Sequence, residues 1–283
     1  MFLDRLPLDL MCCPDCGGEL AKAVAGVDCR GCGRHYALTD DGILIMLPTQ
    51  SLSDDRGQND PDFQKWLEIS SKLSKDYFEN GNGLFNRIHH SSHQAIDTIV
   101  KGLPQARTIL DLGCGAGAHY PYHGDDARVV GLDISLNSLR LVRRQFPAAV
   151  LIQGDAYKLP FKPASFDVVM SVYNLEHIFH LDACLQNVRR ILAADGHFLV
   201  GLPTEGGWFW NGGRALTSGR TIPRDYGIDY AKVIAIEHCN TAAKVIAGLR
   251  QHFRITARTQ WPLAFLPSLN LNFSVTLTCR PKA

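Results

Sequence analysis

Short apolar runs alternate with helix-like segments along most of the chain after Thr108. The runs of strand length are residues 108–112, 128–134, 149–154, 166–173 and 197–203, and later 253–261 and 271–279. Parallel strands need long crossovers, and helices at 135–145 and 181–191 fit that role, so the strands should share one sheet with helices on both faces. The pattern predicts an α/β fold around a mostly parallel seven-stranded sheet.

The length of 283 residues leaves room for a small module beside this fold, because a single hydrophobic core seldom grows beyond roughly 250 residues. Residues 49–62 are polar without an apolar period and predict a linker, and helical stripes are expected at 63–78 and 84–100. The predicted organisation is a small N-terminal domain at 1–48, a linker and helix at 49–83, and a larger domain at 84–283 with a Gly-, Trp- and Arg-rich insertion at about 204–240.

Four cysteines near the N-terminus are spaced as metal ligands. Cys13 and Cys16 form one C-x2-C pair, and Cys29 and Cys32 form a second pair further along. Two such turns can present four sulfurs to one tetrahedral zinc ion, and four protein ligands leave no open position for catalysis. We therefore expect a structural Zn²⁺. A redox dithiol is the alternative, and Cys12 could substitute for Cys13.

This module resembles the small zinc-ribbon family that activates tRNA and protein methyltransferases and that also occurs fused to bacterial methyltransferases. The matching residues are the two cysteine pairs, Gly18, Leu20, Tyr36 and the run from Asp41 to Leu47. The resemblance covers nearly the whole module. It implies a structural zinc and a docking role rather than chemistry.

A glycine-rich loop follows the apolar run 108–112. Gly113, Gly115 and Gly117 allow the backbone to turn sharply and to approach a ligand where a Cβ atom would collide. With Ala118 the loop also satisfies the dinucleotide pattern G-x-G-x-x-A, so the loop alone does not separate cofactors. Asp133 ends the next strand, where a carboxylate can accept hydrogen bonds from two ribose hydroxyls, and this feature fits several adenosine cofactors.

The sequence after the third predicted strand favours one of these cofactors. Asp155 and Ala156 are followed by Leu159-Pro160-Phe161 and by a fourth strand. This block resembles the class I S-adenosylmethionine (SAM) dependent methyltransferases of the "type 11" kind over roughly residues 92–280, and it implies their Rossmann-like fold. One departure is Ala194-Asp195-Gly196, where the family usually has Pro-Gly-Gly.

The resemblance implies a role for each matching residue. Gly113, Gly115 and Gly117 would hold the methionine portion of SAM, with Asp111 supporting the loop and the amino group. Asp133 would bind the ribose. The adenine would be held by Ile134, Asp155 and Ala156.

Tyr173, Asn174 and His177 are candidate catalytic residues because they follow the fourth strand, at the sheet edge where ligands bind. The methyl group of SAM is already activated, so the enzyme mainly has to align the acceptor and exclude water. Asn174 could contact the cofactor or acceptor, and His177 or Tyr173 could take a proton from an acceptor oxygen. The alternative is that the histidine and Glu176 cap the next helix.

Other polar groups support weaker hypotheses. His89, His93 and Asp97 share one helical face, which fits a metal site but also a solvated face or a lid. Some residues of the insertion could bind an anionic or aromatic acceptor: Trp208, Trp210, Arg214, Arg220 and Arg224. They could equally belong to an ordinary surface loop. Glu237-His238, further along the insertion, is a similarly weak candidate.

The composition is that of a globular protein, with 46% hydrophobic and 20% charged residues. No run approaches the ~20 apolar residues of a membrane span, Met1 to Leu10 does not resemble a signal peptide, and the 9 cysteines are an odd number. These features favour a cytoplasmic protein. The net charge is +1, with an acidic segment at 1–60 and a basic remainder.

The expected function is SAM-dependent methyl transfer to an unidentified small-molecule or glycan acceptor. A zinc ribbon before a SAM domain also resembles bacterial 23S rRNA guanine-N1 methyltransferases, so an rRNA or tRNA base methyltransferase is the alternative. The acidic ribbon argues against RNA, since Lys and Arg contacts to phosphate drive such binding. A third hypothesis is a non-catalytic scaffold whose ribbon docks a partner. The acceptor atom, the pathway and the oligomeric state are not predicted.

Overall fold

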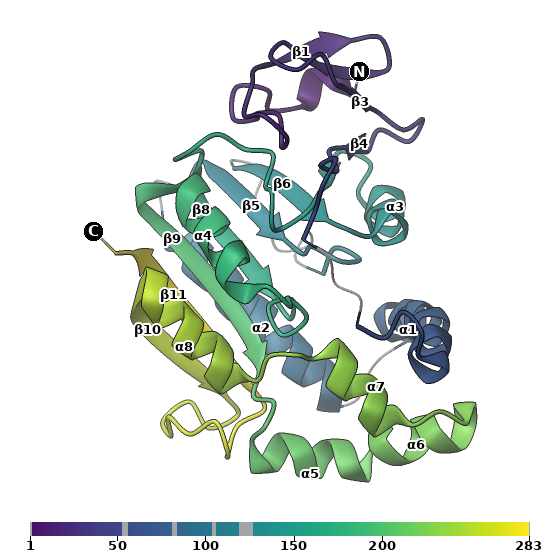
Figure 1. The fold of residues 1–283 in the computed structure, drawn as a ribbon. Coiled ribbons are helices and arrows are strands. Elements are labelled where there is room, and N and C mark those ends of the chain that lie inside the picture. Colours follow the sequence, from purple (N-terminus) through teal and green to yellow (C-terminus); the bar gives the residue numbers. More distant parts are fainter. Residues whose placement is uncertain (1, 53–55, 81–83, 104–105, 119–126, 283) are drawn as a thin grey trace.

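The computed structural model describes residues 2–52, 56–80, 84–103, 106–118 and 127–282, and within 71–90 only the backbone is described. Its main feature is an eight-stranded sheet in the order β10-β11-β9-β8-β5-β6-β7-β4 (Figure 1). The strands are β4 (Leu44–Ile45), β5 (Thr108–Leu112), β6 (Arg128–Asp133), β7 (Val150–Gln153), β8 (Phe166–Val172), β9 (Leu192–Pro203), β10 (Phe253–Trp261) and β11 (Ser274–Pro281).

The predicted α/β architecture is confirmed, but the predicted strand number is wrong. The strands from β9 to β7 pair in parallel, whereas β11 pairs antiparallel with both β9 and β10. The eighth strand, β4, comes from the end of the cysteine module and pairs in parallel with β7. An edge strand offers unpaired backbone groups, and the apolar run around Leu44 satisfies those of β7 while its own side chains are buried.

Helices cover both faces of the sheet. The helical elements are η1 (Leu3–Arg5), α1 (Pro61–Asn80), α2 (Leu84–Lys101), α3 (Leu136–Gln145), α4 (Leu181–Ile191), α5 (Trp208–Leu216), α6 (Ser218–Tyr226), α7 (Tyr230–Glu237) and α8 (Ala242–His252). Leu185 of α4 and Leu249 of α8 pack on one face. Ile96 of α2 packs against the alternate residues of the central strands, on the other face. The helix expected directly after the glycine loop falls on residues 119–126, outside the described part.

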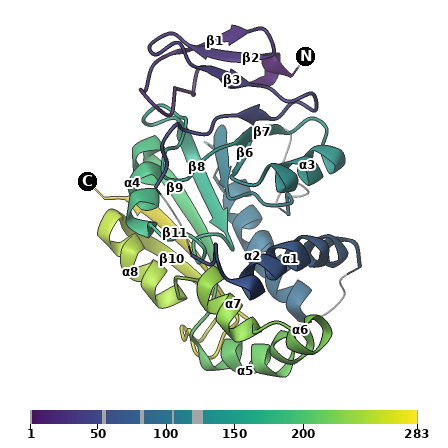
Figure 2. The ribbon, with the colours of Figure 1, turned by 45° about the vertical axis from the view of Figure 1, so that its right-hand side comes forward.

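The N-terminal module is a three-stranded antiparallel sheet of β1 (Leu20–Ala23), β2 (Gly26–Cys29) and β3 (His35–Ala37). The buried residues Met11, Cys13 and Val27 belong to the same apolar cluster as core residues of the larger domain. An antiparallel β-bridge joins Met11 to Phe161. The module therefore packs directly on the larger domain. It lies at the opposite end of the sheet from α5 and α6 (Figure 2).

The insertion after β9 forms three helices rather than a loop. Helices α5, α6 and α7 follow the carboxyl end of β9, and α1 packs against α6 and α7 through Trp66, Ile222 and Val233. The Trp66 and Tyr230 rings are 5.3 Å apart. These elements form a cap at the carboxyl end of the sheet (Figure 2).

Candidate active site

The glycine loop after β5 turns through left-handed backbone conformations. Gly113 has φ +73°, and a Cβ atom there would lie 2.2 Å from the Asn174 side-chain carbon, so only glycine fits. Gly115 has φ +50°, and a Cβ there would meet no atom of the described residues within 4 Å. The loop therefore packs tightly on Asn174 at one glycine and faces open space at the next, as a ligand cradle requires.

Asp133, at the end of β6, fixes this loop. Its carboxylate accepts hydrogen bonds from the backbone N–H of Gly115 at 2.9 Å and of Ser135 at 2.8 Å. Burial raises its pKa, although these backbone bonds act in the opposite direction. The neighbouring Ile134 is 62% exposed, an apolar side chain left open at the mouth of the loop.

Asp111, inside β5, is a buried carboxylate beneath the loop. It is 1% exposed, and its Oδ2 has no hydrogen-bond partner among the described residues. Burial first, and the charge of Asp133 second, raise its pKa to about 8. A buried carboxylate oxygen without a partner is costly, so this position is suited to a ligand that brings a positive charge.

The linker returns to the site, which the sequence did not predict. Asp155 accepts a hydrogen bond from the Tyr157 backbone N–H at 2.7 Å, and its second oxygen accepts one from the Ser51 hydroxyl. Arg56 donates from its guanidinium to the carbonyl of His177 at 3.0 Å and lies over the Phe179 ring. Polar linker composition carried no signal for these contacts.

The residues after β8 meet the glycine loop. The Asn174 amide donates to the carbonyl of Leu112 at 3.2 Å and to the Ser171 hydroxyl at 3.0 Å. Tyr173 adopts φ +52°, a strained conformation for a non-glycine residue, and its hydroxyl lies 3.0 Å from that of Ser92. Strain of this kind, held by packing, is common at functional sites.

Glu176 and His177, two ionisable residues close to Asn174 in the sequence, have pKa values shifted in opposite directions. Burial, followed by the charges of His238 and Arg56, lowers the pKa of His177 to about 3, so its imidazole is neutral. Burial raises the pKa of Glu176 to about 7, and its Oε2 has no partner within the described part of the chain. A group with a pKa near 7 is the better matched to proton transfer at neutral pH. Glu176 is a buried carboxyl group two residues beyond Asn174, to which the sequence assigned only helix capping.

Glu205 and His238 extend this cluster from the cap. His238 Nδ1 lies 2.6 Å from a Glu205 oxygen, and Glu205 also pairs with Arg214 at 3.3 Å. Burial alone would lower the pKa of His238, but the Glu205 bond and nearby carboxylates outweigh it and raise that pKa. The His238 ring meets the His177 ring edge to face at 4.6 Å. The sequence flagged Glu237-His238 only weakly, because their partners lie far away in the chain.

The four predicted zinc ligands converge. Their sulfurs all lie within 4.8 Å of one another, with Cys13–Cys32 at 3.7 Å and Cys16–Cys29 at 3.4 Å. Four sulfurs about 2.3 Å from a tetrahedral zinc would be about 3.8 Å apart. The Gly31 N–H points at the Cys29 sulfur at 3.3 Å, as in a cysteine knuckle. The cluster uses Cys13 and not Cys12, and it is consistent with a small zinc site.

The weaker predictions from the sequence were a metal site at His89, His93 and Asp97 and an acceptor site in the insertion. Within the described residues, no second group of metal-ligand side chains accompanies the cysteines, and the His89 side chain lies outside them. His93 packs edge-on against Tyr173 at 5.9 Å, and Asp97 pairs with Lys101. In the cap, Trp208 is 74% exposed.

Comparison with known proteins agrees with this geometry. Residues 110–200 match the family model described as "Methyltransferase domain". The chain is 35% identical over 96 residues to a demethylmenaquinone methyltransferase from Streptomyces avermitilis, covering 34% of this chain and 42% of that protein. It is 29% identical over 153 residues to a tRNA (carboxymethyluridine(34)-5-O)-methyltransferase from Macaca fascicularis, covering 51% of this chain and 22% of that one.

A solved TehB-like SAM-dependent methyltransferase from Corynebacterium glutamicum superposes with a TM-score of 0.50 at 19% identity, over 76% of this chain and 97% of that chain, which shows the fold. The chain spans about half or less of the two curated relatives named above. Together the matches support a SAM-dependent methyltransferase at a general level and leave the acceptor open. Across the described residues, the helices are too short or too polar to cross a membrane.

Proposed function

We propose that this protein transfers the methyl group of SAM to a small-molecule or glycan acceptor bound under the cap of α1, α5, α6 and α7. The observation that carries the proposal is the pairing of the glycine loop with the buried carboxylate of Asp111, whose Oδ2 has no hydrogen-bond partner among the described residues. That combination matches a ligand with an ammonium group at one end.

The residues of the loop divide the cofactor between them. Asp111 would accept hydrogen bonds from the ammonium of the methionine portion, and the open space beside Gly115 would admit its backbone. Asp133 would accept from the ribose through its remaining lone pairs, since each oxygen has one backbone donor in the structure. Exposed Ile134 would pack on the adenine, with Asp155 and Ala156 along its edge.

When bound, SAM supplies a methyl group on a positively charged sulfur, so the protein's task is alignment and exclusion of water. Asn174 holds the loop and faces Gly113, and we assign it to positioning. Tyr173 and His177 would shape the acceptor side. For a protonated acceptor, Glu176 is the residue best placed by its pKa of about 7 to take the proton.

The cysteine cluster would hold a structural zinc. Four thiolates complete a tetrahedral site without an open position, so the metal would stabilise the ribbon and take no part in methyl transfer. Of the four Lys and Arg residues at 1–48, three pair with a carboxylate: Lys22, Arg30 and Arg34. This neutralisation disfavours the ribbon as an RNA-binding surface.

Calorimetry of the purified chain with SAM and with S-adenosylhomocysteine tests the proposal. We expect one site per chain and no heat with NAD. Binding of NAD in preference to SAM would refute the cofactor assignment, and absence of binding to both would favour a scaffold. A salt-sensitive gel shift with rRNA or tRNA fragments would instead support the alternative base methyltransferase.

A further inference from the structure

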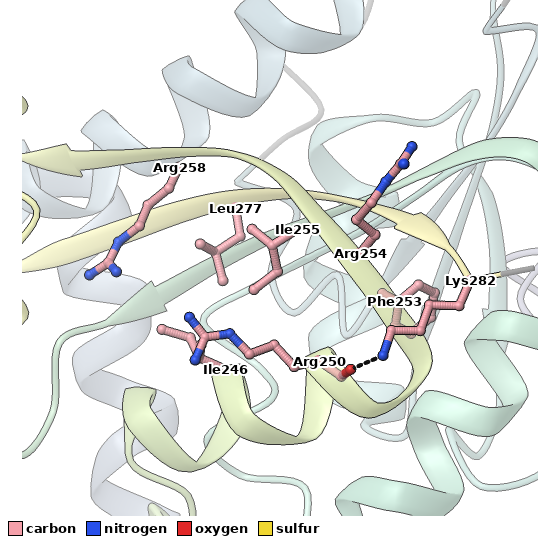
Figure 3. Close-up of a pocket in the computed structure, with 8 residues that line it drawn as sticks. All are labelled: Ile246, Arg250, Phe253, Arg254, Ile255, Arg258, Leu277 and Lys282. Carbon is pink, nitrogen blue, oxygen red and sulfur yellow. Dashed lines mark hydrogen bonds between the residues drawn. The ribbon is translucent and has the colours of Figure 1, made fainter.

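A cavity lies at the β10 edge of the sheet, against helix α8. It has a volume of about 560 Å³ and is lined by Ile246, Arg250, Phe253, Arg254, Ile255, Arg258, Leu277 and Lys282 (Figure 3). It lies between α8 and the edge strand β10, and β11, β9 and β8 separate it from β5. The cavity therefore has no part in the proposed methyl-transfer site.

A β-bulge in β10 directs Arg258 to this cavity. Ile255 pairs with Cys279, whereas Arg258 pairs with Leu277, because the register shifts between Ile255 and Ala257. Without the extra residue, Ile255 and Arg258 would point to opposite faces of the strand. The bulge places both on the α8 face, where Arg250 lies at the end of that helix.

The cavity combines positive charge with an apolar floor. In Figure 3 the guanidinium groups of Arg250 and Arg258 lie on the same side of the cavity. The side chains of Ile255 on β10 and Leu277 on β11 lie between these strands and helix α8. Lys282 joins them at the rim, where its ammonium donates to the carbonyl of Arg250. Among the described residues, the lining of the cavity includes no acidic side chain.

These cations lack counter-charges. Across the described ranges, the guanidinium groups of Arg250 and Arg258 have neither a carboxylate partner nor a hydrogen bond, unlike Arg224 or Arg34 elsewhere. Partial burial, followed by the charge of Arg250, lowers the pKa of Arg258. Two unpaired guanidinium groups that repel one another are stabilised by a bound dianion.

We propose that this cavity binds an organic phosphate, a phosphate monoester carried on an apolar body. A phosphate monoester carries nearly two negative charges at neutral pH and accepts the paired N–H groups of arginine. The cavity volume falls within the range of about 300 to 1,000 Å³ typical of small-molecule sites. The apolar floor and the arginine stems provide the surface for the body of the ligand.

Calorimetry with phenyl phosphate tests this proposal, using the full chain and the variants Arg250→Gln and Arg258→Gln. We expect one binding site, with affinity reduced roughly tenfold in each variant as a charge-assisted contact is lost. Arg144→Gln is the matched control, because Arg144 is exposed on α3, away from the cavity. Inorganic phosphate and benzyl alcohol separate the contributions of charge and apolar body, and both should bind more weakly than phenyl phosphate.

Four results would overturn the proposal. Phenyl phosphate could fail to bind at millimolar concentration, or bind all variants equally. Inorganic phosphate could bind as tightly as phenyl phosphate, which would show that the organic body contributes nothing to the affinity. A short RNA could bind more tightly than phenyl phosphate and be lost in the same variants, which would make the cavity part of a nucleic-acid surface. SAM titrated into each variant should bind as in the parent chain, so this test is independent of the methyltransferase assignment.

Discussion

Replacing Asp111 by Asn should make the stability of the protein less dependent on pH. The carboxyl group has an ordinary pKa of 3.8 and, in the folded chain, a pKa raised to about 8 by burial and by Asp133. Between these values the folded chain holds a proton that the unfolded chain has released. The free energy of unfolding therefore falls as pH rises through this window.

The size of the effect follows from the shift. One pKa unit corresponds to about 1.4 kcal/mol, so the difference between 3.8 and about 8 bounds the penalty at about 6 kcal/mol above pH 8. Between pH 5 and pH 8, the same rule allows a decline of up to about 4 kcal/mol from this group. Glu176, whose pKa is also raised, to about 7, contributes a slope of the same sign in both proteins. The difference between parent and variant therefore isolates Asp111.

Urea unfolding at several pH values, followed by circular dichroism, measures this difference. The test is the slope with pH and not the absolute stability, because Asn also buries polar atoms without partners. The exposed Asp195→Asn is the control, and it should leave the slope unchanged. The same D111N protein should bind SAM at least roughly tenfold more weakly, since a charge-assisted contact to the ammonium is lost. Equal slopes in parent and variant would refute the buried-carboxylate argument.

Three further changes test the site and the ribbon. Asp133→Ala should weaken SAM binding in calorimetry and cost about 1 to 3 kcal/mol of folding free energy, because two backbone N–H groups lose their acceptor; unchanged affinity would show the ribose assignment to be wrong. Gly113→Ala should abolish measurable SAM binding, since its Cβ would lie 2.2 Å from the Asn174 side chain; binding equal to the parent would contradict the cradle geometry. Zinc analysis should give one ion per chain, and Cys16→Ser should lose it and lower the melting temperature by several degrees; a metal-free parent of equal stability would exclude a structural zinc.

Local sequence was sufficient for most of the fold. The residues from Leu181 to Ile191 form the helix their spacing predicts. The long apolar runs gave the central strands because a strand buried on both faces has few other solutions. The strand β4 escaped prediction because its two residues acquire strand structure only by pairing with β7, more than a hundred positions later.

The site was predictable only where a single segment carries the chemistry. The glycine loop and the cysteine pairs are local patterns, and the structure brings the four sulfurs together as their spacing predicts. Glu205 and Ser51 were missed because each meets its partner through the fold, Glu205 at His238 and Ser51 at Asp155. A pKa raised by burial, as for Glu176, likewise has no signature in sequence, because burial is decided by tertiary packing.

Under the proposed SAM assignment, the buried charge of Asp111 and Asp133 favours a cationic ligand at the glycine loop. Asp111 and Asp133 approach closely enough that the charge of one raises the pKa of the other, so the empty loop is least stable when both are ionised. A ligand with a positive charge removes that repulsion and gains an acceptor without a competing partner. The energy that destabilises the free protein at high pH thus becomes binding energy for the cofactor. The affinity for SAM should therefore rise with pH as Asp111 loses its proton, up to the pH at which the ammonium of SAM itself loses its proton.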